Sequence, residues 1–274
     1  MSRRDRGSVW RFLLPVGFLA FTAATVAAVL FKDWMPPVAS EHGKGVDGMI
    51  TYILCAAGLI FVAGHLLLAK FIFTSGADDA PAYKPIGNKA EMLFTIGPTI
   101  FILLISEIGV LFIGNPIWGQ VFKEDPEDFQ IEVIAKQFEW IAHYPGRDGK
   151  FGPFRMEKYD EVDNIAALWK KDKESRDDLV VRGKLILPAG KACQIRIKSF
   201  DVLHSFNIPA FRTKQDAVPG IYTKTRFVAT TPGDYEIACA EICGVNHYKM
   251  KAKVQVLPLE KYMKWLEEEP GFFE

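Results

Sequence analysis

Three long apolar runs fill most of the first 113 residues, and they limit the folds open to this chain more than any other feature. They cover residues 9–31, 49–73 and 92–113. Each has roughly the 20 residues that an α-helix needs to cross the hydrocarbon core of a bilayer. The sequence therefore predicts a membrane-anchored protein, with transmembrane helices in region 1–115.

The first run follows three arginines, Arg3, Arg4 and Arg6, and is either a signal peptide or a retained span. A clear A-x-A cleavage site is missing at its end, which favours retention. The arginines keep the start of the chain in the cytoplasm by the positive-inside rule. Whether two or three spans remain, region 116–274 then lies outside and the loop 74–90 lies in the cytoplasm.

The pattern of residues changes from long apolar runs to alternation at 115–128, where Asn115, Pro116 and Gly119 mark a domain boundary. Beyond it, short segments alternate apolar and polar residues between turns, which indicates a β-sandwich or barrel. The expected strand segments are 130–144, 193–199, 222–230, 235–239 and 251–257. Residues 259–269 predict a short closing amphipathic helix.

Charge and cysteine content exclude some classes of protein. The chain has 33 basic and 33 acidic residues, and its basic residues are scattered, so nucleic acid is not an expected partner. No C-x-x-C-H motif for attaching a c-type haem is present. Cys55 and Cys193 are expected to be packed residues. The charged run 146–183 is expected to be a solvated loop.

Soft metal ligands are concentrated in one stretch, where Cys239, Cys243, His247 and Met250 fall within a dozen residues. His204 lies upstream, on an expected strand. Thiolate and thioether ligands select copper, and imidazole also suits it. A single blue copper needs one cysteine, so the second cysteine favours a dinuclear centre. A disulfide and a structural zinc are the alternatives that the cysteines leave open.

The stretch C-A-E-I-C-G-V-N-H-Y-K-M resembles the copper loop of cytochrome c oxidase subunit II, C-x-E-x-C-G-x-x-H-x-x-M, at every defined position. The resemblance implies a cupredoxin-like Greek-key sandwich that holds the dinuclear copper centre CuA. Cys239 and Cys243 would bridge the coppers, and His204 and His247 would each cap one. The remaining ligands would be Met250 and the backbone carbonyl of Glu241, whose side chain would face a magnesium site shared with subunit I.

The same resemblance implies an oxidase subunit that accepts electrons from cytochrome c at CuA. It would pass them to haem in subunit I, which carries haem and CuB, reduces oxygen to water and moves protons. Subunit III and membrane lipid are further expected partners. The location implied is a bacterial-type inner membrane, with the copper domain on the periplasmic side.

Two acidic residues, one at the start of the third run and one within it, need separate explanations. Glu91 begins E-M-L-F-T-I-G-P, which resembles the family segment E-x-x-W-T-x-x-P with Phe94 in place of Trp. In that family the glutamate opens a proton path into subunit I; alternatively, Glu91 is an acid favoured by the helix dipole. Glu107 lies deeper and has no family counterpart, and we expect it to face protein or to snorkel.

Q-F-E-W at 137–140 resembles the family segment Q-W-Y-W, in which the first Trp receives electrons from cytochrome c. Phe138 takes that position, and Trp140 and Tyr144 are the substitutes to test. Aromatic residues on strands are more commonly part of the core, and that alternative stays open.

K-Q-D-A-V-P-G at 214–220 matches the family turn K-x-D-x-x-P-G, which covers the copper site and contacts subunit I. Asp201 and Asp216 either dock a basic cytochrome c by complementary charge or form turns.

Three other classes of protein remain as alternatives. A quinol oxidase relative lacks the copper ligands, which this chain retains. Nitrous oxide reductase has a similar loop, but this chain has no propeller-sized region and does have several spans. A membrane-anchored copper carrier or assembly factor would not need Glu91 or its motif.

Overall fold

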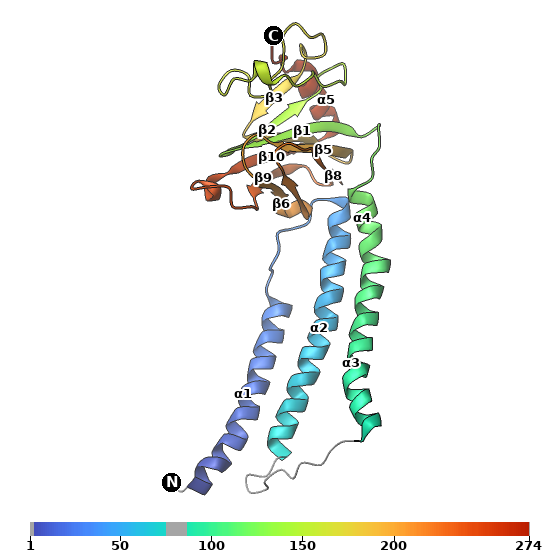
Figure 1. Ribbon diagram of the computed structural model, residues 1–274, viewed down its shortest axis with the longest axis vertical. Helices are drawn as coiled ribbons and strands as arrows, with labels where there is room; N and C mark the ends of the chain where they lie inside the picture. The colour runs from blue at the N-terminus through green and yellow to red at the C-terminus, as the bar shows by residue number, and fades with distance from the viewer. Residues whose placement is uncertain (1–2, 75–86, 274) are drawn as a thin grey trace. The chain divides into compact units, whose positions relative to one another are not determined.

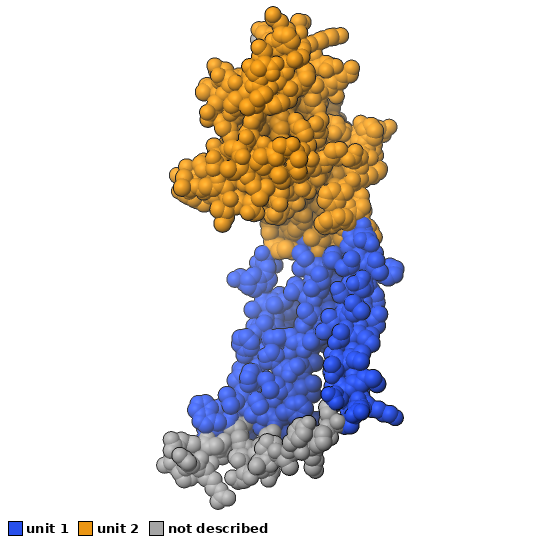
Figure 2. All heavy atoms as spheres, in the orientation of Figure 1, with its two compact units in different colours: residues 1–34, 47–115 blue, residues 35–46, 116–274 orange. Residues whose placement is uncertain are grey.

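A computed structural model describes residues 3–74 and 87–273. The chain divides into two compact units, residues 1–34 with 47–115 and residues 35–46 with 116–274 (Figure 2). The first unit is helical and the second contains every strand of the described residues. Residues 75–86, in the expected cytoplasmic loop, lie outside the described residues.

All three apolar runs form helices, as predicted (Figure 1). Helix α1 is Arg3–Phe31 and α2 is Glu41–Thr74. Helix α3, Asn88–Ile108, continues through a π-helical turn, Gly109–Gly114, into α4, Asn115–Val121. Helical segments long and apolar enough to cross a membrane are Phe12–Phe31, Glu41–Thr74 and Asn88–Val121. This composition indicates a membrane anchor.

Helical structure continues past the break expected at Asn115. Pro116, the second residue of α4, follows the π-helical turn Gly109–Gly114. Within the helical unit, α2 contacts the end of α3 through Tyr52, whose hydroxyl donates to the Ile105 carbonyl at 2.6 Å. A Cβ on Gly109 would lie 2.6 Å from the Tyr52 ring, so glycine permits this close approach.

The second unit is a β-sandwich of two five-stranded sheets, followed by helix α5, Leu259–Glu268. Both features match the expected fold. The sheet order is β3-β2-β1-β5-β8 in one layer and β4-β10-β9-β6-β7 in the other. The strands are β1 Phe129–Lys136, β2 Glu139–Tyr144, β3 Leu179–Arg182, β4 Lys184–Pro188, β5 Ala192–Ser199, β6 His204–Ile208, β7 Thr213–Ala217, β8 Thr223–Val228, β9 Gly233–Cys239 and β10 Lys251–Leu257.

Alternating apolar side chains fill the space between the sheets. Cys193, Ile195 and Ile197 of β5 are fully buried, as the period of two predicts. Tyr262 of α5 is also buried, with its ring edge-to-face against Phe129 of β1 at 5.4 Å. The closing helix therefore completes one end of the core.

Two strand expectations are corrected by the structure. The segment 130–144 forms a hairpin rather than one strand, because Lys136 pairs with Glu139 and leaves only a two-residue turn. The family turn at 214–220 is partly strand, since Thr213–Ala217 is β7.

The expectation of a solvated loop at 146–183 holds only in part, because much of the run is irregular and exposed but some of it is strand or buried. Its last residues form β3, and Ile165, Ala166 and Leu168 are buried against Ile134 and Ile141. These two isoleucines lie on the other face of β1 and β2 from the main core. The segment therefore covers that face with a second, smaller core, which its many charged residues concealed.

Candidate metal centre

The predicted ligands are brought together by two neighbouring strands. His204 is the first residue of β6 and Cys239 is the last residue of β9. These strands are antiparallel, with Phe206 paired to Cys239. The loop then returns to β10, and the Cys239 amide donates to the Met250 carbonyl at 3.1 Å. Sheet pairing thus fixes both ends of the loop.

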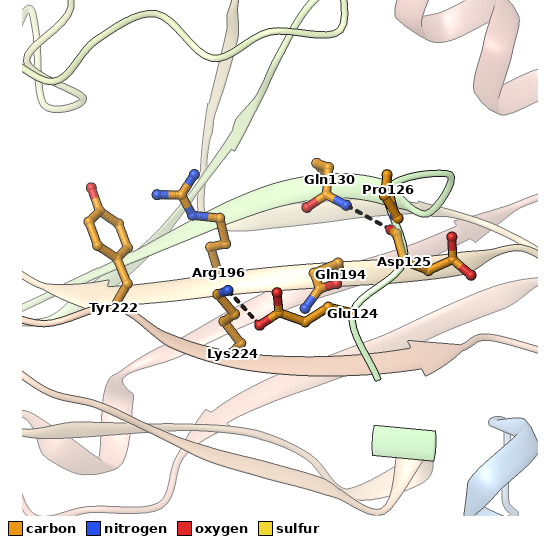
Figure 3. Close-up of a pocket in the computed structure, with 8 residues that line it drawn as sticks. All are labelled: Glu124, Asp125, Pro126, Gln130, Gln194, Arg196, Tyr222 and Lys224. Carbon is orange, nitrogen blue, oxygen red and sulfur yellow. Dashed lines mark hydrogen bonds and ion pairs between the residues drawn. The ribbon is translucent and has the colours of Figure 1, made fainter. Parts of the chain in front are cut away.

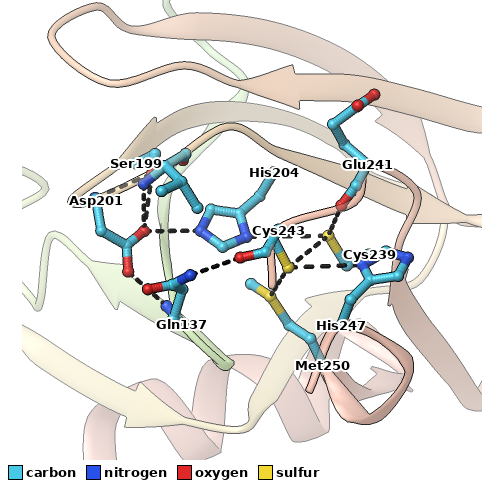
Figure 4. Close-up of polar contacts among 10 residues, drawn as sticks. Gln137, Ser199, Asp201, His204, Cys239, Glu241, Cys243, His247 and Met250 are labelled. Atoms are coloured by element: carbon cyan, nitrogen blue, oxygen red, sulfur yellow. Dashed lines mark hydrogen bonds and ion pairs between the residues drawn. The ribbon is translucent and has the colours of Figure 1, made fainter. Parts of the chain in front are cut away.

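The donor atoms converge around the two sulfurs (Figure 4). Cys239 Sγ and Cys243 Sγ are 3.9 Å apart. Cys239 Sγ lies 3.9 Å from His204 Nδ1, and Cys243 Sγ lies 3.5 Å from His247 Nδ1. Each imidazole therefore faces a different sulfur.

Two further donors complete the cluster. Met250 Sδ is 3.7 Å from Cys243 Sγ, and the carbonyl oxygen of Glu241 is 3.2 Å from Cys239 Sγ. The Glu241 carboxylate points away from the sulfurs (Figure 4). The six predicted metal-binding residues thus meet in one place, and Glu241 does so through its backbone.

The cluster is largely shielded from solvent. His204 and Met250 are fully buried and Cys243 is nearly so. Burial, together with the neighbouring Cys239 sulfur, raises the pKa of the Cys243 thiol to about 11. A bound cation would offset both effects and favour the thiolate.

An acidic side chain contacts the His204 ring nitrogen that faces away from the sulfurs. Asp201 Oδ1 lies 2.8 Å from His204 Nε2, so the ring can donate to Asp201 while Nδ1 faces the sulfur. Burial raises the pKa of Asp201, but hydrogen bonds from the Gln137 amide, His204 and the Val202 amide outweigh it and lower the pKa overall. Carboxylate partners of this kind fix the orientation of a metal-binding imidazole.

Gln137 joins the β1–β2 turn to both ligand segments. Its backbone N–H donates to Asp201 Oδ2 at 2.7 Å, and its side-chain amide donates to the Cys243 carbonyl. Gly244 packs tightly here, since a Cβ would lie 2.9 Å from Gln137 Nε2 and 3.0 Å from the Phe138 ring. Sequence reasoning missed both supporting roles, although Gln137 stood in the aromatic motif and Asp201 stood three residues before His204.

This donor set fits copper. Cys239 and Cys243 are free thiols, which argues against the disulfide alternative. The donors of His204, Cys239 and Cys243 lie within 4.8 Å of one another, and His247 joins through Cys243. Thiolate, thioether and imidazole together are the ligands that copper prefers.

The aromatic candidates differ in exposure. Trp140 is 1% exposed, and its ring centroid lies 6.2 Å from that of His204. Tyr144 is also buried, and its hydroxyl donates to the Ile186 carbonyl. Phe138 is half-buried at the β1–β2 turn and lies against Gly244. Of the three, Phe138 alone combines partial exposure with a position beside the ligand loop.

The acidic candidates lie elsewhere. Glu91 is exposed in the first turn of α3, in the helical unit, and Glu107 is exposed in the same helix. Asp216 accepts hydrogen bonds from Ser205 and Lys214. With Asp201 also bonded internally, both proposed docking acids already have intramolecular partners.

A separate polar pocket of about 360 Å³ lies over β5 and β8 (Figure 3). Lys224 pairs there with Glu124 at 2.7 Å, and Arg196 stacks on Tyr222 at 4.6 Å. Its lining is mostly charged and amide groups, with Pro126 and Tyr222, and holds no sulfur or imidazole, so its chemistry differs from that of the ligand cluster.

Comparison with known proteins identifies the family. Residues 129–257 match the family model described as cytochrome c oxidase subunit II, periplasmic domain. The alternative cytochrome c oxidase subunit 2 of Bradyrhizobium diazoefficiens is 31% identical over 258 residues, which cover 93% of this chain and 91% of that protein. Cytochrome c oxidase subunit 2 of Cereibacter sphaeroides is 30% identical over 253 residues, which cover 88% of this chain and 80% of that protein.

Among solved structures, the periplasmic domain of subunit II of cytochrome oxidase from Bradyrhizobium japonicum is 27% identical, with a TM-score of 0.38. The match covers 51% of this chain and 91% of that domain. Two relatives that match most of the chain agree with the family model, so this chain belongs to the cytochrome c oxidase subunit II family of the haem-copper oxidases.

Proposed function

We propose that this chain receives electrons from a cytochrome c and delivers them to haem in an oxidase partner subunit, which reduces oxygen to water and translocates protons. The proposed carrier is a pair of copper ions held by His204, Cys239, Cys243, His247, Met250 and the Glu241 carbonyl. The observation that carries the proposal is the pairing of one imidazole with each sulfur, at 3.9 Å and 3.5 Å. Two sulfurs with an imidazole at each end suit two metal ions better than one.

When bound, the copper pair would supply a one-electron redox couple. The chain's own contribution is rigidity and shielding. Strands β6 and β9 anchor the ends of the ligand segments, Asp201 orients His204, and Gln137 holds the Cys243 carbonyl. Ligands held this firmly change position little between oxidation states, which favours fast electron transfer.

For the donor side, we favour Phe138 as the residue through which electrons enter. It is half-buried and lies against Gly244 of the ligand loop. Trp140 lies too deep to touch a docked protein, but its ring faces His204 and can form part of the internal path.

For the acceptor side, the Glu241 carboxylate points away from the sulfurs and is free to face another subunit (Figure 4). We propose that it contributes to a magnesium site shared with oxidase subunit I. Subunit III and lipid complete the expected surroundings in a bacterial-type inner membrane, with the sandwich on the periplasmic side.

Glu91 is proposed to open a proton path into subunit I. Its exposed position in the first turn of α3 leaves the carboxylate accessible to a neighbouring subunit. Slower turnover of the assembled oxidase in Glu91→Gln, with normal turnover in Glu107→Gln, would support this role; equal turnover in the two variants would oppose it.

Electron paramagnetic resonance of the copper-loaded full chain tests the copper proposal. Hyperfine splitting from two equivalent copper nuclei is expected, because the unpaired electron would be shared between them. Cys239→Ser should abolish the shared signal, while Cys55→Ser, which changes a cysteine in α2, should retain it. An unchanged signal in Cys239→Ser would contradict bridging by both thiols.

A further inference from the structure

A buried histidine lies between two buried carboxylates on the face of the sandwich that segment 146–178 covers. His143 of β2 is 2% exposed. Its Nδ1 lies 3.1 Å from Glu132 Oε2 of β1, and its Nε2 lies 2.8 Å from Asp178 Oδ2. Both ring nitrogens can donate at once only when the imidazole is protonated. Two ionised carboxylates, which can only accept, therefore favour the charged form of His143. Burial raises the pKa of Asp178 and outweighs its contact with His143, whereas the pKa of His143 is raised by both carboxylates despite burial.

Charge balance supports the same conclusion. Lys198 of β5 lies 3.0 Å from Glu132 Oε2 and is itself nearly buried. With His143 protonated, its charge and that of Lys198 balance Glu132 and Asp178. Loss of the His143 proton would leave one uncompensated negative charge among buried groups, which is strongly destabilising.

Asp178 is the point at which three parts of the chain meet. Its carboxylate accepts from the Gly152 amide at 2.8 Å, near the start of the covering segment. Its carbonyl accepts from the Phe272 amide at 2.7 Å, in the C-terminal tail. Phe151 covers the His143 ring, with centroids 4.9 Å apart. The contact between His143 and Asp178 thus ties the sheet to both ends of segment 146–178 and to the tail.

The remaining charged groups nearby do not replace this contact. Arg196 of β5 faces the Phe151 ring at 5.8 Å rather than either carboxylate. Asp177 adds negative charge beside Asp178 and accepts from the Arg147 amide at 2.6 Å. His143 is therefore the group that balances Asp178.

We propose that Glu132, His143 and Asp178 form a pH-sensitive latch, which holds segment 146–178 and the C-terminal tail on the sheet and releases them when His143 loses its proton. The latch does not depend on copper, since none of its members contacts a metal-binding residue.

The direction of the pH effect follows from the pKa shifts. Burial lowers the pKa of His143, but its contacts with Asp178 and Glu132 outweigh burial and raise the pKa above 6.5. A raised histidine pKa stabilises the latch below the unfolded value, and this stabilisation is lost as pH rises through the folded value. Burial raises the pKa of Glu132, but His143 and Lys198 bring it down to about 2, so Glu132 stays ionised throughout that range.

Hydrogen exchange of the full-length chain in detergent, followed by mass spectrometry, tests the latch. The readout is the exchange of peptides from 146–178 divided by that of β9 and β10 peptides in the same molecule, so the intrinsic pH dependence of exchange cancels. In the wild type this ratio should rise as pH increases through the His143 transition. His143→Gln should raise it at least about tenfold at low pH, because a buried charge loses its partner, and should remove the transition.

Glu157→Gln is the matched control, because Glu157 is an exposed acid in the same segment. It should behave like the wild type. A wild-type ratio that stays constant from pH 5 to pH 10 would overturn the latch, as would a transition that persists in His143→Gln. If His143→Gln does not fold, the same exchange ratio is measured for the wild type and for Asp178→Asn across the pH range. A transition in Asp178→Asn identical to that of the wild type would contradict the proposal.

Discussion

Asp201 connects parts of the metal centre that lie far apart in the sequence. One carboxylate oxygen meets His204 Nε2 and the other accepts the Gln137 amide. These contacts hold one ligand and the β1–β2 turn in a fixed relation. The proposed copper ligands alone therefore do not define the site.

Asp201→Ala should weaken copper binding by roughly 10- to 100-fold, as is typical when the carboxylate partner of a metal-binding histidine is removed. Competition titration with a copper chelator measures the change. Asp234→Ala is the control, because Asp234 forms an exposed ion pair with Lys253 away from the cluster. Equal copper affinity in Asp201→Ala and Asp234→Ala would show that the orienting contact is dispensable.

Gly244→Ala should destabilise the loop by about 1–3 kcal/mol, because Gly244 has φ +139 and its new Cβ would collide with Gln137. The Gln137 amide would then leave the Cys243 carbonyl. Thermal unfolding and the optical spectrum of the copper-loaded chain measure these effects.

Gly190→Ala provides the comparison, since Gly190 also has a positive φ, +70, but open space around its Cβ position. It should lower stability and leave the spectrum unchanged. If Gly244→Ala also left the spectrum unchanged, the packing of Gln137 would not influence the ligands.

At this scale, the sequence predicted which residues gather but not what supports them. Cys239, Cys243 and His247 are close in sequence, so their types and spacing carried the prediction. Gln137 and Cys243 are 106 positions apart, and their hydrogen bond depends on the hairpin turn. The sequence did not predict that turn, because residues 130–144 have the character of a single strand throughout.

At the scale of secondary-structure elements, the structure of segment 146–178 differs most from what its sequence predicted. Acidic and basic residues dominate it, yet Ile165, Ala166 and Leu168 form a buried group. Charge composition predicted solvation because the apolar residues are few and irregularly spaced. Long alternating strands such as β5 and β10 were predictable, whereas the four-residue β3 was too short for its pattern to stand out.

Leu168→Ala should reduce the free energy of unfolding by about 2–5 kcal/mol, because Leu168 is 1% exposed in this second core. Val162→Ala, at a position 75% exposed, should have little effect. Thermal unfolding of the full chain compares them. A similar small effect for both would indicate that the segment does not pack on the sheet.

Helix α5 makes a comparable contribution to the main core. Tyr262→Ala should reduce the free energy of unfolding by about 3–5 kcal/mol, because the ring is buried against Phe129 and Trp265. Met263→Ala, one position along and 38% exposed, is the matched control. Denaturant unfolding should separate the two variants clearly, and coincident curves would contradict a packing role for α5.

For the whole molecule, the division into a membrane-spanning half and a β-sandwich half was predictable from apolar run length and period. The exact extent of each unit was not. Residues 35–46 belong to the compact unit of the sandwich, with the Ala39 amide donating to the Ala210 carbonyl at 2.8 Å. Such long-range backbone pairing leaves no local signal in the sequence.

The metal content of the full chain, purified in detergent from copper-replete cells, tests the central claim most directly. Elemental analysis together with thiol counting measures it. The ligand arrangement predicts two copper ions per chain, no zinc, and no disulfide between Cys239 and Cys243. One copper ion, a zinc ion, or a bond between these cysteines would contradict the paired copper centre.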